Sequence, residues 1–218
     1  NLKTIYMAGG EPFLIKENLK IIDLIKKENP DLLLRINTNL SLLTPKIYNQ
    51  LKEMKNVHWI LSAEATNERF NYIRWPGNYQ TFKNNLEKIR MLPHKITFNM
   101  TWNILCVESI FDFIDDMLKN NFHPNSFVMN FVHEPIEYHP NNLSESHRQK
   151  VLDVLEIRKQ NTDKKFYLWK VYNEMSNILK EPLLYHQKKL YNMLMRYDKQ
   201  RNLESRNIFP ELYSEVLN

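Results

Sequence analysis

The most informative part of the sequence is Thr4-Ile5-Tyr6-Met7-Ala8-Gly9-Gly10-Glu11-Pro12. Its first five residues predict a β-strand, and a segment with helical periodicity begins near Phe13. The chain has only three glycines, so an adjacent pair at a strand end is a specific feature. Glycine lets backbone groups approach a ligand, and Glu11 adds a carboxylate there. The pattern therefore fits either a site for a ligand with an ammonium group or a strand-to-helix turn that Pro12 opens.

Short extended apolar runs recur along the first part of the chain, with helical patterns between them. The predicted strands are Thr4–Ala8, Leu32–Asn37, Val57–Ser62, Lys95–Thr101 and Phe127–Val132. The predicted helices run from near Phe13 to Asn29, from Pro45 to about Met54, from Thr81 to Met91 and from Ser109 to Leu118. Strands that alternate with helices of about ten residues or more indicate βα units and a parallel sheet, so we expect an α/β fold.

The pattern changes after Val132, where strands are no longer visible. A loop over residues 133–143 leads to a helix, for which Asn142 and Glu145 resemble a capping pair. Two more helical stretches are predicted, at 166–179 and 183–197. We therefore expect a βα region over 1–135 and a helical C-terminal extension over 136–218.

Composition limits the possible classes of protein. A chain of 218 residues that is 43% hydrophobic can bury one core, and no apolar run approaches the ~20 residues of a membrane span. We expect a soluble, cytoplasmic protein that does not bind membranes. The net charge of +5 is scattered over predicted helix surfaces, so a nucleic-acid partner is not indicated. Cys106 is the only cysteine, which excludes an internal disulfide and any site in this chain with two or more thiolates.

Polar residues follow every predicted strand. The strand ends carry Gly9-Gly10-Glu11, Asn37-Thr38-Asn39, Ser62-Ala63-Glu64, Thr101-Trp102-Asn103 and Asn130 to Glu134. In parallel βα folds the carboxyl ends of the strands form one rim, where ligands bind. A single polar strand end is weak evidence for a site, because Asn and Ser are common in turns. Five polar strand ends together predict a pocket for a polar small molecule. Thr97, Asn99 and Thr101 share one face of their strand, which indicates either a polar barrel interior or a solvated edge strand.

For three other candidate sites, an ordinary structural role is favoured over a functional one. His133, Glu134, Glu137 and His139 do not have the spacing of a helical metal site, so we expect no metal there. Cys106 lies in an apolar run, as a small buried residue does. The aromatic and basic residues between Phe166 and Tyr197 have a helical spacing that fits packing better than nucleic-acid stacking.

The chain resembles the radical S-adenosylmethionine (SAM) superfamily, in particular members with a shortened auxiliary domain called twitch. The matching segments are Gly9-Gly10-Glu11-Pro12, Asn37-Thr38-Asn39, Ser62-Ala63-Glu64-Ala65, the run from Asn67 to Gly77 and, at the end of the chain, Phe209-Pro210-Glu211-Leu212. The third segment departs from the family's usual Ser-x-Asp-Gly. The resemblance covers most of residues 1–135 and, more loosely, the C-terminal segment.

The resemblance implies a partial (β/α)6 barrel, a partial TIM-type barrel, that binds SAM. It also implies a [4Fe-4S] iron–sulfur cluster, which reduces SAM so that a 5′-deoxyadenosyl radical forms and modifies a substrate. In this family a Cys-x-x-x-Cys-x-x-Cys loop holds the cluster after the first strand, and Gly-Gly-Glu follows the second. Here Gly-Gly-Glu follows the first predicted strand. We therefore interpret the chain as a fragment of a longer protein and expect it to be inactive alone, with the cluster only in a longer chain.

The resemblance also implies roles for individual residues. Gly9, Gly10 and Glu11 would contact the methionyl ammonium of SAM, and Arg74, helped by Ser62, would pair with its carboxylate in a fork-like geometry. The implied partners for the ribose are Glu64 and Asn103, and Asn39 lies on the same rim. For Arg74 the alternative is a surface position stacked on Trp75.

The sequence supports two hypotheses about function, one for an enzyme and one for a binding protein. The first is the core and C-terminal part of a radical SAM enzyme with an unknown substrate, for which a peptide or protein is the default. The second is a catalytically inactive, barrel-derived binding or scaffold module with a basic helical tail. A third, an unrelated enzyme for phosphorylated small molecules, lacks support because the sequence has no phosphate-binding glycine loop.

Overall fold

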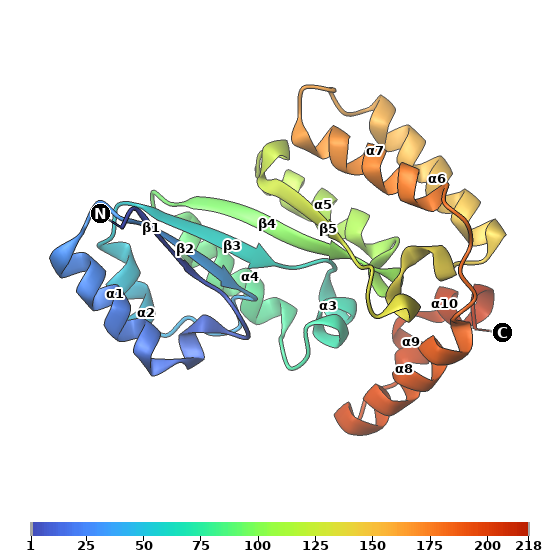
Figure 1. Ribbon diagram of the computed structural model, residues 1–218, viewed down its shortest axis with the longest axis horizontal. Coiled ribbons are helices and arrows are strands. Elements are labelled where there is room, and N and C mark those ends of the chain that lie inside the picture. Colours follow the sequence, from blue (N-terminus) through green and yellow to red (C-terminus); the bar gives the residue numbers. More distant parts are fainter. Residues whose placement is uncertain (1, 218) are drawn as a thin grey trace.

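A computed structural model describes residues 2–217 (Figure 1). Its centre is a five-stranded sheet in the order β1-β2-β3-β4-β5, and all four strand pairs are parallel. The strands are β1 (Thr4–Met7), β2 (Leu33–Thr38), β3 (Val57–Ser62), β4 (Lys95–Trp102) and β5 (Phe127–Phe131). Spatial order follows chain order, as expected when each strand is joined to the next by a helical crossover. The predicted α/β fold with five parallel strands is confirmed.

Helices connect the strands. They are α1 (Lys16–Glu28), α2 (Pro45–Lys52), α3 (Asn67–Ile73), α4 (Tyr79–Arg90) and α5 (Ser109–Lys119). The first helix begins later than predicted, because Pro12–Leu14 forms a separate 3-10 turn with Glu11 as its N-cap. The seven-residue helix α3 was not predicted.

The two faces of the sheet differ in chemistry, because alternate residues of a strand point to opposite faces. One face carries large buried side chains in register, including the pairs Leu61 with Phe98 and Met100 with Met129. The other face carries polar side chains: Asn37, His58, Ser62, Thr97, Asn99, Thr101 and Asn130. Since β4 lies between β3 and β5, the alternative of an edge strand is wrong.

The C-terminal part consists of further helices. They are α6 (Glu145–Gln160), α7 (Tyr167–Leu179), α8 (Gln187–Arg201), α9 (Ser205–Ile208) and α10 (Pro210–Glu215), preceded by 3-10 turns at Ile136–Tyr138 and Pro140–Asn142. The predicted capping pair was wrong: Ser144 caps α6, and its hydroxyl accepts a hydrogen bond from the amide of His147. Helix α8 also begins later than predicted, at Gln187.

The C-terminal helices lie at two places on the sheet region. In Figure 1, α6 and α7 lie beside β5, while α8, α9 and α10 lie near α3. The second contact includes the Arg69–Glu211 ion pair, in which the shortest N–O distance is 2.6 Å, and a hydrogen bond of 2.8 Å from the Tyr72 hydroxyl to Asp198. One hydrophobic core runs through both parts. Within residues 2–217, no helix is long and apolar enough to cross a membrane.

Candidate functional site

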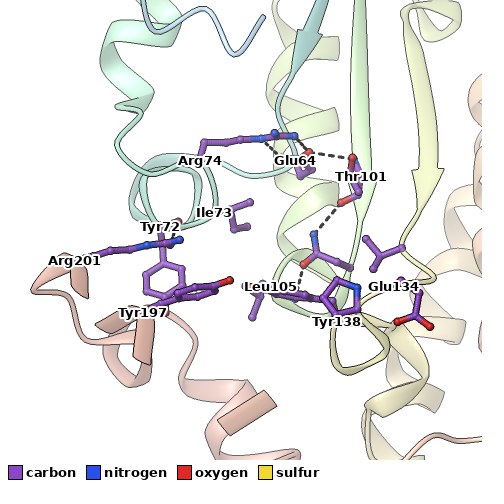
Figure 2. A pocket seen from close by; sticks show the side chains of 13 residues that line it. Glu64, Tyr72, Ile73, Arg74, Thr101, Leu105, Glu134, Tyr138, Tyr197 and Arg201 are labelled. Carbon is purple, nitrogen blue, oxygen red and sulfur yellow. Dashed lines mark hydrogen bonds and ion pairs between the residues drawn. The ribbon is translucent and has the colours of Figure 1, made fainter. Parts of the chain in front are cut away.

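A pocket of about 260 Å³ lies where the carboxyl ends of β3 and β4 meet α8 (Figure 2). Glu64 follows β3, while Thr101 and Asn103 come from the end of β4. The segment after β5 forms one side, and α3 with α8 forms the other. The volume is near the lower end of the ~300–1,000 Å³ of ligand sites, so the pocket suits one part of a ligand.

Glu64 and Arg74 form an ion pair at the inner end of the pocket. Both Glu64 oxygens accept from the Arg74 guanidinium, and one of these bonds is 2.7 Å long. The amide of Thr101 also donates to Glu64, at 3.1 Å. Burial lowers the pKa of Arg74 to about 10, which leaves it protonated at neutral pH. Glu64 is 1% exposed, so a charge here is stable only because it is paired.

Asn103 shapes the backbone next to this ion pair. Its side-chain oxygen accepts from the amide of Leu105 at 2.9 Å, and its nitrogen donates to the carbonyl of Thr101 at 3.0 Å. These bonds fix the turn from β4 into the following 3-10 helix. Cys106 lies in that turn, fully buried, and burial raises the pKa of its thiol to about 12. A thiol in this state is not a nucleophile at neutral pH.

The opposite wall of the pocket is aromatic and basic. Arg201 on α8 lies against three rings, with its guanidinium carbon 4.3 Å from the ring centre of Tyr197 and 5.5 Å from those of Tyr72 and Trp75. Figure 2 shows Arg201, Tyr72 and Tyr197 on one side of the pocket and Glu134 with Tyr138 on the other. Trp75 therefore stacks with Arg201 and not, as the alternative proposed, with Arg74.

The Gly9-Gly10-Glu11 turn lies at the same rim but outside the pocket. Both glycines have positive φ angles, +93° and +55°, and a Cβ at either position would meet no atom within 4 Å. The backbone is therefore open to a ligand, in a conformation that favours glycine. The Glu11 carboxylate points inward instead, where it accepts from the Thr38 hydroxyl at 2.6 Å and from the amide of Phe13. Burial raises its pKa.

Ser62 and Asn39 also bond within the protein. The Ser62 hydroxyl donates to the side chain of Asn37 at 3.1 Å, on the polar face of the sheet. Asn39 accepts from the amide of Ser41 at 2.9 Å, which stabilises the loop after β2. Glu64, Arg74 and Asn103 are thus the predicted residues that share the pocket, while Gly9, Gly10, Glu11, Asn39 and Ser62 lie elsewhere along the rim.

Comparison with known protein families identifies the family to which the chain belongs. The model of the family described as "Radical SAM superfamily" matches residues 1–126, which is more than half of the chain. The chain belongs to the radical SAM superfamily. The matched range includes Glu64, Arg74 and Asn103 of the pocket, whereas α8 lies outside this range. No curated protein sequence matches the chain.

Solved structures share the radical SAM fold of this chain. SuiB of Streptococcus suis bound to the precursor peptide SuiA gives a TM-score of 0.55 at 14% identity, over 79% of this chain and 40% of that one. SuiB bound to S-adenosylmethionine gives 0.52 at 16% identity, over 71% and 37%. The protein anSMEcpe with bound AdoMet and Cp18Cys peptide gives 0.53 at 13% identity, over 72% and 47%. The present chain therefore spans less than half of the length of each.

Of the two cofactors of the radical SAM superfamily, SAM fits the residues of this chain, whereas the iron–sulfur cluster does not. A cluster-binding loop of three cysteines has no counterpart, because the chain has one cysteine and it is buried. Within residues 2–217, no group of three or more His, Cys, Asp or Glu side chains could hold a metal ion. The open backbone at Gly9 and Gly10, with the charged groups of Glu64 and Arg74, fits a ligand that carries ammonium, carboxylate and hydroxyl groups, as SAM does.

Sequence reasoning missed the outer wall of the pocket. Tyr138, Tyr197 and Arg201 were not predicted as site residues, although all three line the pocket. The only signal was the spacing of Tyr197 and Arg201, which places them on one face of a helix. Nothing in that spacing says which surface the helix contacts.

Proposed function

We propose that this chain is the core and C-terminal part of a radical SAM enzyme and that SAM binds along the rim from Gly9 to Asn103. The carrying observation is that the open backbone at Gly9 and Gly10 and the Arg74 guanidinium lie on one rim, because carbonyl oxygens and a guanidinium there can recognise the ammonium and the carboxylate of a zwitterionic ligand. When SAM is bound beside a reduced cluster it supplies a 5′-deoxyadenosyl radical.

Each residue has a proposed part in this binding. The carbonyls of Gly9 and Gly10 accept from the methionyl ammonium, and Arg74 donates to the carboxylate. Ser62, Asn39 and Asn103 offer further hydrogen bonds, and Glu64 accepts from ribose hydroxyls. Glu64 and Arg74 pair with each other in the structure. Ligand binding therefore requires that some of the hydrogen bonds between them are replaced by hydrogen bonds to the ligand. Glu11 contributes through its backbone, because its carboxylate is bonded to Thr38.

We further propose that a cluster-binding loop precedes this segment in a longer protein. The outer edge of β1 supports this, because β1 pairs only with β2 among the described strands. Leu2, just before β1, and Tyr6 on β1 are 61% and 52% exposed. An unpaired strand with exposed apolar neighbours is a place where another strand can add. In the same proposal, residues 136–218 take the place of the twitch domain.

A peptide or protein is the proposed substrate. Two similar structures support this, since SuiB is bound to a precursor peptide in one and anSMEcpe to a peptide in the other.

Titration with S-adenosylhomocysteine tests the proposal. Calorimetry on the 218-residue chain, and on a longer protein with reconstituted cluster, should show binding, and Glu64→Gln should weaken it by about tenfold because a charge-assisted contact is lost. Glu211→Gln is the matched control, since it disrupts an ion pair with Arg69 and neither of these two residues lines the pocket. Absence of binding in the longer protein would refute the assignment.

The inactive binding module remains a second candidate function, and one observation favours it. The chain has a single cysteine, and in its pocket Glu64 and Arg74 are paired with each other. The gene sequence upstream of Asn1 separates the two functions. Three cysteines at the family spacing support the enzyme, whereas a start codon close to Asn1 supports the binding module.

A further inference from the structure

Arg201 is held in a fixed position on the outer wall of the pocket. Its guanidinium lies between the rings of Tyr72, Trp75 and Tyr197 and donates to the carbonyl of Tyr72 at 3.0 Å. A guanidinium that is already ordered loses little entropy when it binds a ligand. The aromatic contacts therefore place this cation in advance at the mouth of the pocket.

The charge of Arg201 is not neutralised by an ion pair. Within residues 2–217, five arginines pair with Asp or Glu, whereas Arg201, like Arg35, Arg196 and Arg206, has no salt bridge to a carboxylate. Asp198 lies three residues earlier on α8, and its oxygens accept from Tyr72 and from the amide and hydroxyl of Ser205. Arg201 thus keeps N–H donors for an external anion, next to a pocket that it lines.

The surroundings select among anions. Glu134, an exposed carboxylate, lies on the opposite side of the pocket, and Glu64 lies at its inner end (Figure 2). A phosphate with nearly two negative charges would face the Glu134 carboxylate and the Glu64–Arg74 pair, whose own charges cancel, so that Arg201 alone would compensate it. A carboxylate carries a single charge and matches the guanidinium fork in two parallel bonds. The tyrosine rings beside Arg201 provide apolar surface for the rest of the ligand.

We propose that Arg201 is the substrate-recognition residue of this pocket and binds a carboxylate of a peptide substrate. This inference rests on the proposed function, because it assigns the inner end of the pocket to SAM and the outer end to the substrate. The carboxylate belongs either to an acidic side chain or to the C-terminus of the peptide. Arg201 binds and orients this group.

Three peptides test the proposal and distinguish the two sources. They are acetyl-Ala-Tyr-Glu-Ala-amide, acetyl-Ala-Tyr-Gln-Ala-amide and acetyl-Ala-Tyr-Gln-Ala with a free C-terminus, titrated into the isotope-labelled chain and followed by NMR chemical shifts. At least one carboxylate peptide should bind about tenfold more tightly than the neutral amide and shift signals of Tyr197 and Arg201. Equal binding of all three, or no binding up to their solubility limits, overturns the proposal.

Variants show whether Arg201 is responsible. Arg201→Gln should remove the preference for the carboxylate peptide, a loss of about tenfold, while Arg201→Lys should retain part of it because the charge stays but the fork is lost. Arg196→Gln is the matched control: Arg196 also stacks on Tyr197, at 5.5 Å, but is exposed and does not line the pocket. Circular dichroism checks folding, and the peptide comparison on the unaltered chain needs no variant.

Two further outcomes separate this inference from the proposed function. If inorganic phosphate shifts the Arg201 signals at lower concentration than acetate does, a carboxylate site is wrong. If S-adenosylhomocysteine binds but Arg201→Gln keeps the peptide preference, the inference fails and the proposed function stands. If the preference depends on Arg201 while S-adenosylhomocysteine does not bind, the carboxylate site stands and the SAM assignment fails.

Discussion

At the residue scale, the central group is Glu64, which was expected to meet a ligand and is bonded within the protein instead. It accepts from the Arg74 guanidinium and from the amide of Thr101, so it joins α3 to the end of β4. This arrangement supports the fold, and it also holds two charges in place for a ligand that can replace part of the pair. The role of Glu64 can therefore be tested by measuring both the stability of the protein and its affinity for a ligand.

Glu64→Gln should lower the free energy of unfolding by about 3 kcal/mol, because Arg74 would keep its buried charge without a partner. Urea unfolding measures this difference. Glu211→Gln, which breaks a pair whose side chains are about one-quarter exposed, should cost only about 1 kcal/mol. Equal losses for both variants would contradict a special role for burial at Glu64.

His58 gives a prediction about pH. Burial, then the nearby charges of Lys95 and Arg35, lower its pKa from the ordinary 6.5 to about 4. The unfolded chain therefore takes up the proton first as the pH falls, so stability is full above 6.5 and declines toward pH 4. Because the ring is partly exposed and solvent screens its charge, we expect a decline of about 1 kcal/mol from this residue.

Urea unfolding between pH 7 and pH 4 measures the decline. His58→Gln should flatten the curve in this window, since glutamine does not titrate and can still bond to Thr97 as His58 does. Lys95→Gln should flatten it in part, because one of the charges that lower the pKa is removed. A curve for His58→Gln that matches the unaltered protein would count against this assignment.

At the scale of elements, helix ends explain where sequence patterns succeeded and failed. Thr44-Pro45 was read as a helix start, and Thr44 does cap α2 by accepting from the amide of Ile47. The start of α6 was misread, because two polar candidates lie close together and only the backbone decides which one caps. Helix α3 was missed, since seven residues show less than two helical turns of periodicity.

The end of α8 depends on Asn202, whose φ of +52° is left-handed. Asn202→Ala should lower the free energy of unfolding by about 1 kcal/mol, because a Cβ without a compensating polar group disfavours this conformation. Asn202→Gly should cost little, since glycine adopts it freely. Asn192→Ala, at an exposed helical position of the same helix, is the control and should be neutral or slightly stabilising. Thermal unfolding of the three variants gives the comparison.

At the scale of the whole molecule, the C-terminal helices complete both the core and the pocket. Phe209 is 1% exposed and packs edge-on against Tyr72, with ring centres 5.2 Å apart. Tyr72 in turn lines the pocket and bonds to Asp198 on α8. The division at residue 135 that the sequence suggested therefore crosses continuous packing, and we expect the chain to unfold as one unit.

Phe209→Ala tests this expectation. It should lower the free energy of unfolding by about 3–5 kcal/mol because it leaves a cavity in the core. In a Trp75→Phe, Trp169→Phe background, tryptophan fluorescence comes only from Trp59 and Trp102 of the sheet, and it should shift together with far-UV circular dichroism. If the two regions fold separately, the fluorescence transition of the sheet would stay in place while the helical signal shifts.

Local sequence patterns were sufficient to predict the α/β class, the five strands and the rim on which polar residues gather. Each of these follows from local information: apolar runs, glycine, proline and the direction that parallel strands share. Three contacts followed only from the packing of the folded chain: Glu64 pairs with Arg74, Glu11 turns toward Thr38, and Arg201 reaches a pocket lined mainly by residues between positions 64 and 138. These contacts depend on how a distant helix packs, and helical spacing fixes the face of a helix but not its partner.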